Sequence, residues 1–244
     1  MINIARVLPL LVISFIVTGC VSHQPTVNFS DSFLEKKGKT VGIARTKTIE
    51  AETTYTGSIG LLDYGIISAV NSGLDNHLKT LEFPEYTSLQ NEIAKLLKEK
   101  GLSVIIIEDP IDKEKFKIKT SENGKNTTKF TAIKEKHSLD YILLLDLQKL
   151  GTTRSYYGPA PTSDPIATTN ILGQMIDLNT GKLEWYRAAK TEVLIDEPWD
   201  ESESKYPNLT NAVYRSFDNA IQIIKQDFTL EQASNKVTTT KTVN

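Results

Sequence analysis

The chain has 244 residues, of which 39% are apolar and 24% are charged, and these proportions are ordinary for a globular protein. Its formal net charge of −2 at pH 7 carries no basic excess, which argues against a nucleic-acid-binding protein. Its single cysteine, Cys20, excludes a disulfide within the chain, so the fold must be stabilised by its core.

The first twenty residues follow the pattern of a secretory signal. Arg6 and the amino terminus place positive charge before an apolar run, VLPLLVISFIV at residues 7–17. A helix needs ~20 apolar residues to cross a bilayer, whereas this run is shorter and contains Pro9. The pattern therefore predicts a signal peptide over residues 1–19 rather than a transmembrane helix.

The next residues, Val17-Thr18-Gly19-Cys20, resemble the lipobox of bacterial lipoproteins. The thiol is the best nucleophile available for alkylation. The resemblance implies signal cleavage between Gly19 and Cys20 and acylation of Cys20 by palmitate-type chains, several of which hold a protein durably on a membrane. Val21 stands where the family's inner-membrane retention signal has Asp, which implies the outer membrane and its periplasmic face. The alternative is an ordinary signal peptide with a chance cysteine.

The rest of the chain divides into a tether, one domain and a tail. Residues 20–38 are predicted to be the lipidated cysteine and a polar tether, residues 39–228 a mixed α/β periplasmic domain, and residues 229–244 a flexible tail without periodicity. Three tether side chains are expected to dock on the domain, namely Phe29, Phe33 and Leu34.

The first half of the domain is predicted to hold one strand and two helices. Residues 40–48 alternate apolar and small side chains, which indicates a strand. Residues 58–81 carry apolar side chains at every third or fourth position, which predicts a long helix with one core-facing stripe. The stripe consists of Ile59, Leu62, Ile66, Val70, Leu74, Leu78 and Leu81. A second helix is expected over residues 85–100, between Pro84 and Gly101.

The second half is predicted to be rich in strands. Residues 102–109 and 140–150 are continuous apolar runs typical of buried strands, and residues 125–137 show a weaker helical pattern. Two further strands, residues 169–178 and 182–195, are expected to form a β-hairpin. A C-terminal amphipathic helix is indicated by Leu209, Val213, Phe217, Ala220, Ile224 and Phe228. These elements predict the α/β (α+β) class, with a single mixed sheet and helices packed on it.

Few residues point to chemistry. The sequence GKT at residues 38–40 lacks the upstream glycine of a phosphate-binding loop, and the three histidines lack the spacing of metal ligands. Asp146 and Asp177 interrupt apolar strands, and paired carboxylates can perform acid–base catalysis. An Asp at a strand end more often caps a turn, as we expect of Asp177 before Asn179. We therefore predict a protein that is not an enzyme and that uses no metal or cofactor.

Two features stand out as candidate contact surfaces. Gly65, Ala69 and Gly73 recur at every fourth position and give the long helix one smooth face, which packs either on the protein's own sheet or on another copy. The segment 151–165 is rich in proline and glycine and is predicted to be a stiff loop.

The candidate partner-binding residues are Arg154, Tyr156 and Tyr157 in that segment, with Trp199 in the acidic loop 196–206. Aromatic side chains and arginine carry much of the binding energy at protein interfaces. The alternatives are a hairpin connection whose aromatic rings fold back on the sheet and, for the acidic loop, a solvated loop.

The stretch ILGQMIDLNTGKLEWYRAAKTEVLI, residues 171–195, and the order of elements resemble outer-membrane lipoproteins related to the curli secretion channel subunit and to the lipoprotein activator of penicillin-binding proteins. In those families a buried strand, here residues 139–145, precedes a hairpin with Thr-Gly in its turn. The resemblance covers residues 39–228 and implies a lipid-tethered domain that contacts a larger envelope machine. The charged residues 113–129 and the prolines of 151–165 depart from the pattern of a pore.

The sequence thus predicts a non-catalytic outer-membrane lipoprotein whose domain binds a protein partner of an envelope assembly, secretion or cell-wall machine. One alternative is a small-ligand-binding protein or enzyme that uses Asp146, Asp177 and the segment around Tyr156. Another is a homo-oligomeric ring built on the stripe of Gly65, Ala69 and Gly73.

Overall fold

A computed structural model describes residues 24–30, 33, 38–112, 119–120, 126–127, 130–203 and 205–229. Seven strands form one mixed sheet around the longest strand, β6 (Tyr141–Tyr157). The path across the sheet is β3-β1-β6-β8-β9, and β2 and β7 pair with the far half of β6. The predicted fold class, a single mixed sheet with helices packed on it, is confirmed.

The strands differ in length and direction. The other strands of this sheet are β1 (Thr40–Arg45), β2 (Glu52–Ser58), β3 (Ser103–Ile106), β7 (Ala160–Pro161), β8 (Ile166–Asp177) and β9 (Leu183–Leu194). Strands β6, β8 and β9 form an antiparallel ladder, whereas β1 and β2 both run parallel to β6. Two short strands, β4 (Lys119–Thr120) and β5 (Asn126–Thr127), pair only with each other among the described residues.

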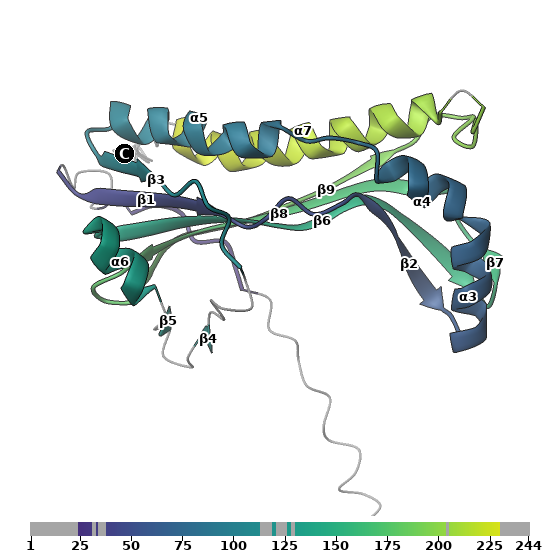
Figure 1. Ribbon diagram of the computed structural model, residues 1–244, viewed down its shortest axis with the longest axis horizontal. Coiled ribbons are helices and arrows are strands. Elements are labelled where there is room, and N and C mark those ends of the chain that lie inside the picture. Colours follow the sequence, from purple (N-terminus) through teal and green to yellow (C-terminus); the bar gives the residue numbers. More distant parts are fainter. Residues whose placement is uncertain are drawn as a thin grey trace, which may run out of the picture.

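The helices cover the sheet unevenly, as Figure 1 shows. Helices α5 (Glu85–Glu99) and α7 (Pro207–Thr229) lie side by side on the upper face, and α6 (Thr131–His137) lies on the lower face. Helices α3 (Leu61–Val70) and α4 (Ser72–Leu78) lie at the far end, near β2 and β7. We call this end of the molecule the arm; it consists of β2, β7, α3, α4 and residues 151–157 of β6.

The main core lies between the sheet and the pair α5 and α7. The six apolar positions that predicted the C-terminal helix are all buried in it. Trp185 of β9 and Tyr86 of α5 are among the largest fully buried side chains. The Tyr86 hydroxyl donates to the carbonyl of Leu145 at 2.9 Å and accepts from the amide of Leu147 at 3.0 Å. Tyr86 therefore hydrogen-bonds to β6 where the pairing with β1 ends, at Leu145, and before the pairing with β2 begins, at Gly151. Burial raises the pKa of Tyr86 to about 12.

The N-terminal tether docks on the domain, as the sequence predicts for Phe29 and Phe33. The backbone of Val27 exchanges two hydrogen bonds with that of Tyr186 on β9, at 3.0 and 2.9 Å. Phe29 and Phe33 are buried, and the Phe29 ring stacks on that of Trp185 with centroids 5.6 Å apart. Leu34 lies outside the described residues. The docked segment, residues 24–30, therefore packs at a defined position along the edge strand β9.

The structure corrects three expectations in the arm. The predicted long helix over 58–81 is divided at Asn71 into α3 and α4. Strand β2 was not predicted, because its sequence ETTYTGS is polar and lacks an apolar alternation. The predicted stiff loop over 151–165 is wrong for its first half, because β6 continues through Tyr157. Pairing with β2 on one side, and with β8 up to Thr153 and β7 at Tyr156 and Tyr157 on the other, keeps this part of β6 extended.

Candidate interaction surface

The break between α3 and α4 is held by a buried polar group. The side-chain nitrogen of Asn71 donates to the carbonyl of Ile67 at 2.7 Å and to the hydroxyl of Tyr156 at 2.9 Å. The Arg154 guanidinium donates to the side-chain oxygen of Asn71 at 3.3 Å. A buried polar side chain is stable only when it is hydrogen-bonded, so these bonds anchor the helix break to β6.

The guanidinium of Arg154 also joins the arm to the loop after β9. It lies over the ring of Trp199 at 4.7 Å from the centroid, and its Nε donates to the carbonyl of Ser163 at 3.0 Å. The Trp199 indole donates in turn to the carboxylate of Asp164 at 3.2 Å. Such a cation–π contact is worth roughly 0.5–2 kcal/mol. Trp199 and Arg154 remain partly exposed, so they form a rigid edge at the surface.

Three of the four candidate partner-binding residues therefore converge, but they do so differently from the prediction. Tyr156 is only 4% exposed, and its ring points into the arm rather than outward. Tyr157 follows it on the opposite face of β6 and is 75% exposed. The expectation that Tyr156 offers its ring to a partner is therefore wrong in this conformation, whereas Arg154, Tyr157 and Trp199 remain at the surface.

A second contact attaches α4 to β2. The Tyr55 hydroxyl donates to one carboxylate oxygen of Asp75 at 2.7 Å, and the amide of Thr53 donates to the other at 3.1 Å. Burial, together with the neighbouring carboxylate of Asp75, holds the pKa of Tyr55 far above its usual range. The Tyr55 ring meets those of Tyr64 and Tyr156 edge-on, each at 5.7 Å. The arm is thus braced from within by hydrogen-bonded tyrosines.

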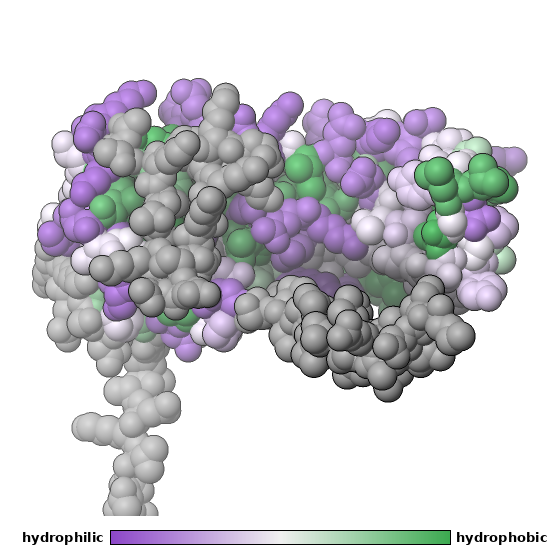
Figure 2. Space-filling view, turned by 90° about the horizontal axis from the view of Figure 1, so that it is seen from below, coloured by the Kyte–Doolittle hydropathy of each residue, from purple (hydrophilic) through white to green (hydrophobic). Residues whose placement is uncertain are grey.

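Helix α3 carries the largest group of exposed apolar side chains among the described residues. We call this group the apolar tip; it consists of Leu61, Leu62, Tyr64, Ile66 and Val70. Their exposed fractions run from 52% for Ile66 to 91% for Leu61. In the view from below, hydrophobic side chains gather over the arm (Figure 2). Ile67 is the one buried residue of α3.

One expectation for this helix is wrong, and one of the two alternatives for its small residues is excluded. The stripe of Leu62, Ile66 and Val70 was expected to face the core, but these side chains face solvent. Gly65, Ala69 and Gly73 are exposed as well, so their smooth face does not pack on the protein's own sheet. The sequence did contain an indication that this helix does not pack on the core. Apolar side chains occupy more than one side of 61–70, whereas a surface helix on a core has one polar side.

The two aspartates of the enzyme alternative do not come together. In the ladder between β6 and β8, Asp146 lies opposite Leu172 and Asp177 lies opposite Tyr141. Five residues of β6 thus separate the two carboxylates, or roughly 17 Å at the rise of an antiparallel strand. Asp146 accepts from the side chain of Gln148 at 2.9 Å. The two carboxylates cannot share one substrate atom in acid–base catalysis.

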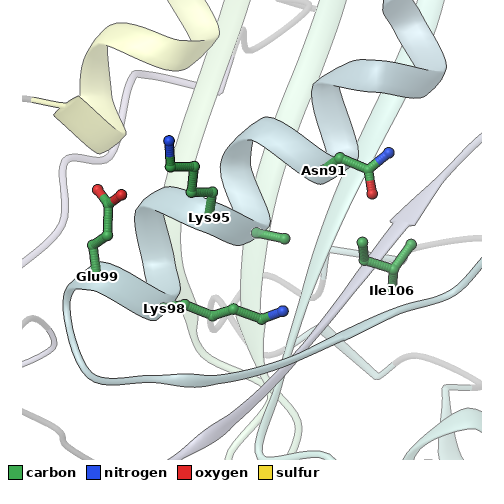
Figure 3. A pocket seen from close by; sticks show the side chains of 6 residues that line it. Asn91, Lys95, Lys98, Glu99 and Ile106 are labelled. Atoms are coloured by element: carbon green, nitrogen blue, oxygen red, sulfur yellow. The ribbon is translucent and has the colours of Figure 1, made fainter.

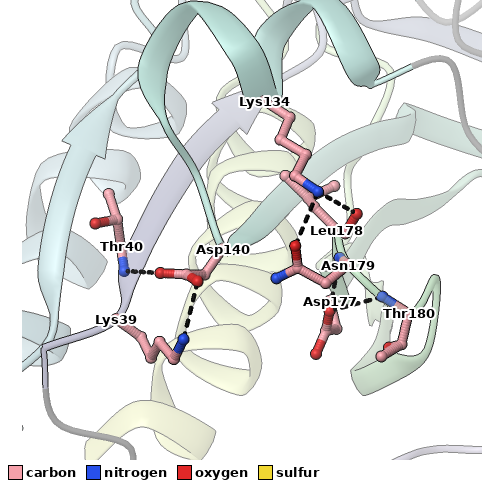
Figure 4. A network of polar contacts seen from close by, with 8 residues as sticks. All are labelled: Lys39, Thr40, Lys134, Asp140, Asp177, Leu178, Asn179 and Thr180. Carbon is pink, nitrogen blue, oxygen red and sulfur yellow. Dashed lines mark hydrogen bonds and ion pairs between the residues drawn. The ribbon is translucent and has the colours of Figure 1, made fainter.

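Asp177 has the structural role that the sequence predicts. Its Oδ1 accepts from the amides of Asn179 and Thr180 at 2.8 and 3.0 Å, which closes the hairpin turn (Figure 4). Lys134 of α6 donates to the carbonyl of Leu178 at 3.1 Å, and this ties α6 to the same turn. Asp177 is therefore a turn cap.

Two hollows lie on the surface of the described residues. A groove of about 450 Å³ between α5 and β3 is lined by Asn91, Ala94, Lys95, Lys98, Glu99 and Ile106 (Figure 3). Its charged side chains are exposed, so nothing fixes them around a ligand. A second hollow, of about 290 Å³, lies beside Asp146. In the part of the chain that the structure describes, no cluster of three His, Cys, Asp or Glu side chains could hold a metal ion.

Two predicted features concern the membrane. Gly19 and Cys20 lie outside the described residues, so signal cleavage and lipidation stay predictions. None of the described helices is long and apolar enough to span a bilayer.

Comparisons with known proteins give likenesses of fold only. No family model matches the chain, and no curated protein matches it in sequence. Among solved structures, lipoprotein GNA1162 from Neisseria meningitidis is 14% identical, with 74% of this chain and 99% of that chain covered and a TM-score of 0.28. Protein XCC0632 from Xanthomonas campestris is 9% identical, with 82% and 92% covered and a TM-score of 0.32.

A PelC dodecamer from Paraburkholderia phytofirmans is 10% identical, with 83% of this chain and 95% of that chain covered and a TM-score of 0.28. The neighbours thus include a bacterial lipoprotein. At these TM-scores the likeness carries nothing about function or assembly. None of the three is a curli secretion channel subunit or an activator of penicillin-binding proteins, so that resemblance stays a prediction.

Proposed function

We propose that this chain is a non-catalytic lipoprotein of the bacterial outer membrane. It is anchored through Cys20, its domain faces the periplasm, and it binds a protein component of an envelope assembly, secretion or cell-wall machine. The anchor is supported by the signal pattern and the lipobox at residues 17–20. The non-catalytic role is supported by the separation of Asp146 from Asp177, which keeps these two carboxylates from acting as a pair.

The observation that carries the protein-binding role is the rigid edge of the arm. There, Arg154 is held between the ring of Trp199 and the carbonyl of Ser163, and Tyr157 stands exposed at the end of β6. Arginine, tyrosine and tryptophan are enriched at the energetic centres of interfaces. Side chains that are already fixed lose little entropy when a partner binds. This edge is therefore the proposed partner site.

The proposal is tested by cross-linking in cells that express the full lipidated chain. The test variant is Tyr157→Ala with Trp199→Ala, which leaves the buried Tyr156 and Asn71 in place. The matched control is Lys98→Ala with Lys95→Ala on α5, at the opposite end of the molecule. We expect a specific cross-linked protein with the wild type and the control, and its loss with the test variant.

Retention of the same cross-linked protein by the test variant would move the partner site away from the arm edge. The absence of any cross-linked protein would favour the ligand-binding or enzymatic alternative. Cys20→Ser checks the anchor separately, because this variant should leave the membrane fraction.

A homo-oligomer is the second candidate, because the stripe of Gly65, Ala69 and Gly73 faces solvent rather than the sheet. Small residues let two helices approach closely. Ala69→Leu should then lower the native mass of the purified protein. An unchanged mass would exclude an assembly built on this stripe.

A further inference from the structure

Helix α3 carries a single charged side chain and exposes mainly apolar ones. Its single charged residue is Asp63, whose carboxylate already accepts from the amide of Gly60 at 3.0 Å. The helix has no basic residue in its last turn, and its apolar tip faces solvent. A helix that is apolar on all sides is usually buried in a core or in a membrane. Among the described residues, the protein's own chain fully buries only Ile67 of this helix.

The tether places the proposed lipid anchor close to the domain. Six residues, 21–26, separate Cys20 from Val27, which is bonded through its backbone to Tyr186. An extended chain spans at most ~3.5 Å per residue, so the acylated Cys20 lies within roughly 25 Å of β9. A longer, undocked tether would let the domain move freely above the membrane, whereas this one keeps the domain at the bilayer surface.

The first residues of the docked segment and α3 lie on the same side of the sheet. In Figure 1 the docked segment, drawn in purple, starts on the lower side and reaches the edge strand β9, where Phe29 packs against Phe228 of α7. Helix α3 and the end of β2 extend to that side as well. Figure 2, seen from below, shows hydrophobic side chains of the arm on this face. The face on which the docked segment begins therefore also presents the apolar tip (Figure 1).

We propose that α3 is a second membrane contact, in which the apolar tip enters the leaflet that holds the acyl chains of Cys20. The proposal rests on the lipid anchor proposed above. With ten residues α3 is about 15 Å long, whereas a hydrocarbon core is ~30 Å thick, so α3 enters the leaflet without crossing it. Such helices reach ~5–10 Å into the boundary between headgroups and acyl chains. Tyrosines, such as Tyr64, are enriched at that depth.

Lipid fits the apolar tip better than a second copy does. Five large side chains at these exposures amount to roughly 600 Å² of surface, the upper end for a typical monomer. A stable protein interface needs ~800 Å² from each partner. A membrane contact needs less intrinsic affinity, because the anchor already holds the helix at a high local lipid concentration. Since α3 has no Lys or Arg, the contact does not depend on anionic lipid.

The test uses the full lipidated chain in vesicles of phosphatidylethanolamine, with and without phosphatidylglycerol. Leu62→Cys receives an environment-sensitive fluorophore, and the label goes only to position 62 because acylation blocks Cys20. The control is Lys98→Cys on α5, away from the lower face. We expect a blue-shifted emission at position 62 and at least about twofold quenching by phospholipids that carry a nitroxide near the headgroup. Neither is expected at position 98.

The quenching at position 62 should not change with the protein-to-lipid ratio or with phosphatidylglycerol. A blue shift without lipid quenching, growing with protein density, would assign the apolar tip to a second copy and overturn the proposal. Emission typical of water at position 62 would overturn it too, while leaving the anchor intact. Protein that fails to float with the vesicles would overturn the anchor and this inference together. Hydrogen exchange of α3 in the unlabelled wild type, slowed by the same vesicles, checks that the label does not create the contact.

Discussion

The side-chain amide of Asn71 donates a hydrogen bond to the hydroxyl of Tyr156, 2.9 Å away, and this bond links the break between α3 and α4 to the far end of β6. Both residues are buried, and 85 positions separate them in the chain. The bond explains how a helix with a single buried side chain of its own keeps a defined place on the arm. The orientation of the apolar tip depends on it.

Tyr156→Phe should lower the free energy of unfolding by roughly 1–2 kcal/mol, because it removes one acceptor from the buried amide of Asn71. Denaturant unfolding measures the loss, and hydrogen exchange should become faster in α3 than in α7. Tyr157→Phe is the matched control, because that side chain is 75% exposed and should change the stability by less than ~0.5 kcal/mol. Equal effects of the two variants would contradict the role given to this bond.

Gly151→Ala should be strongly destabilising, by roughly 2 kcal/mol or more. Gly151 has a φ of +123°, and a Cβ there would lie 2.2 Å from the carbonyl oxygen of Glu52 on β2. Gly65→Ala is the control, since nothing lies within 4 Å of that position on α3. The helical propensity of alanine should there add roughly 0.5–1 kcal/mol. Thermal unfolding of the two variants should move in opposite directions, and a common shift would contradict the close approach of β2 and β6.

Asp140→Asn should reduce stability at neutral pH and have little effect in acid. Burial alone would raise the pKa of Asp140, but the Thr40 amide at 2.9 Å and the Lys39 ammonium at 3.0 Å lower it below 3.8 (Figure 4). A carboxyl whose folded pKa is lowered stabilises the fold above its unfolded pKa, and loses this contribution as pH falls through the folded value. The difference between wild type and variant should be roughly 1 kcal/mol at pH 7 because the pair is partly exposed.

That difference should stay constant from neutral pH down to about pH 5, begin to fall near the unfolded pKa, and be lost as pH falls through the folded pKa. Urea unfolding at a series of pH values measures it. A difference that persists unchanged at about pH 2 would show that packing, and not the charge of Asp140, is responsible.

Phe29→Ala should release the docked segment from β9. The ring of Phe29 is buried between Trp185 and Phe228, and its removal leaves a cavity worth roughly 3 kcal/mol or more. Limited proteolysis should then cut residues 24–30 faster than in the wild type. Thr26→Ala, at an exposed position of the same segment, should leave the cutting rate unchanged. Equal rates for all three proteins would contradict the docking of the tether.

The sequence predicts an element correctly where one hydrophobic periodicity packs against one core. The apolar positions of α7 repeat with helical period, and all six lie in the core. The turn after β8 contains Asp177 and Asn179, whose local hydrogen bonds form whatever the rest of the fold does. The phenylalanines of the tether could be predicted to dock because polar neighbours surround them.

The arm could not be predicted in this way. Strand β2 is polar, and it is a strand because β6 offers it a parallel edge formed by residues far along the chain. Periodicity shows that Leu62, Ile66 and Val70 share a side of a helix, but not which surface that side meets. Tyr156 and Tyr157 are adjacent and chemically alike, yet the pleat of β6 buries one and exposes the other.

By itself, the sequence determined the fold class and the local elements outside the arm. Hydrophobic periodicity and turn residues act over a few positions, so they can be interpreted without the tertiary structure. The lipobox and the length of the tether are also matters of sequence alone. Only the tertiary structure decided that α3 faces outward, on the side of the sheet where the docked segment begins (Figure 1). Its physical reason is the hydrogen bond between Asn71 and Tyr156, which turns the chain away from the core and leaves most of the surface of the apolar tip exposed among the described residues.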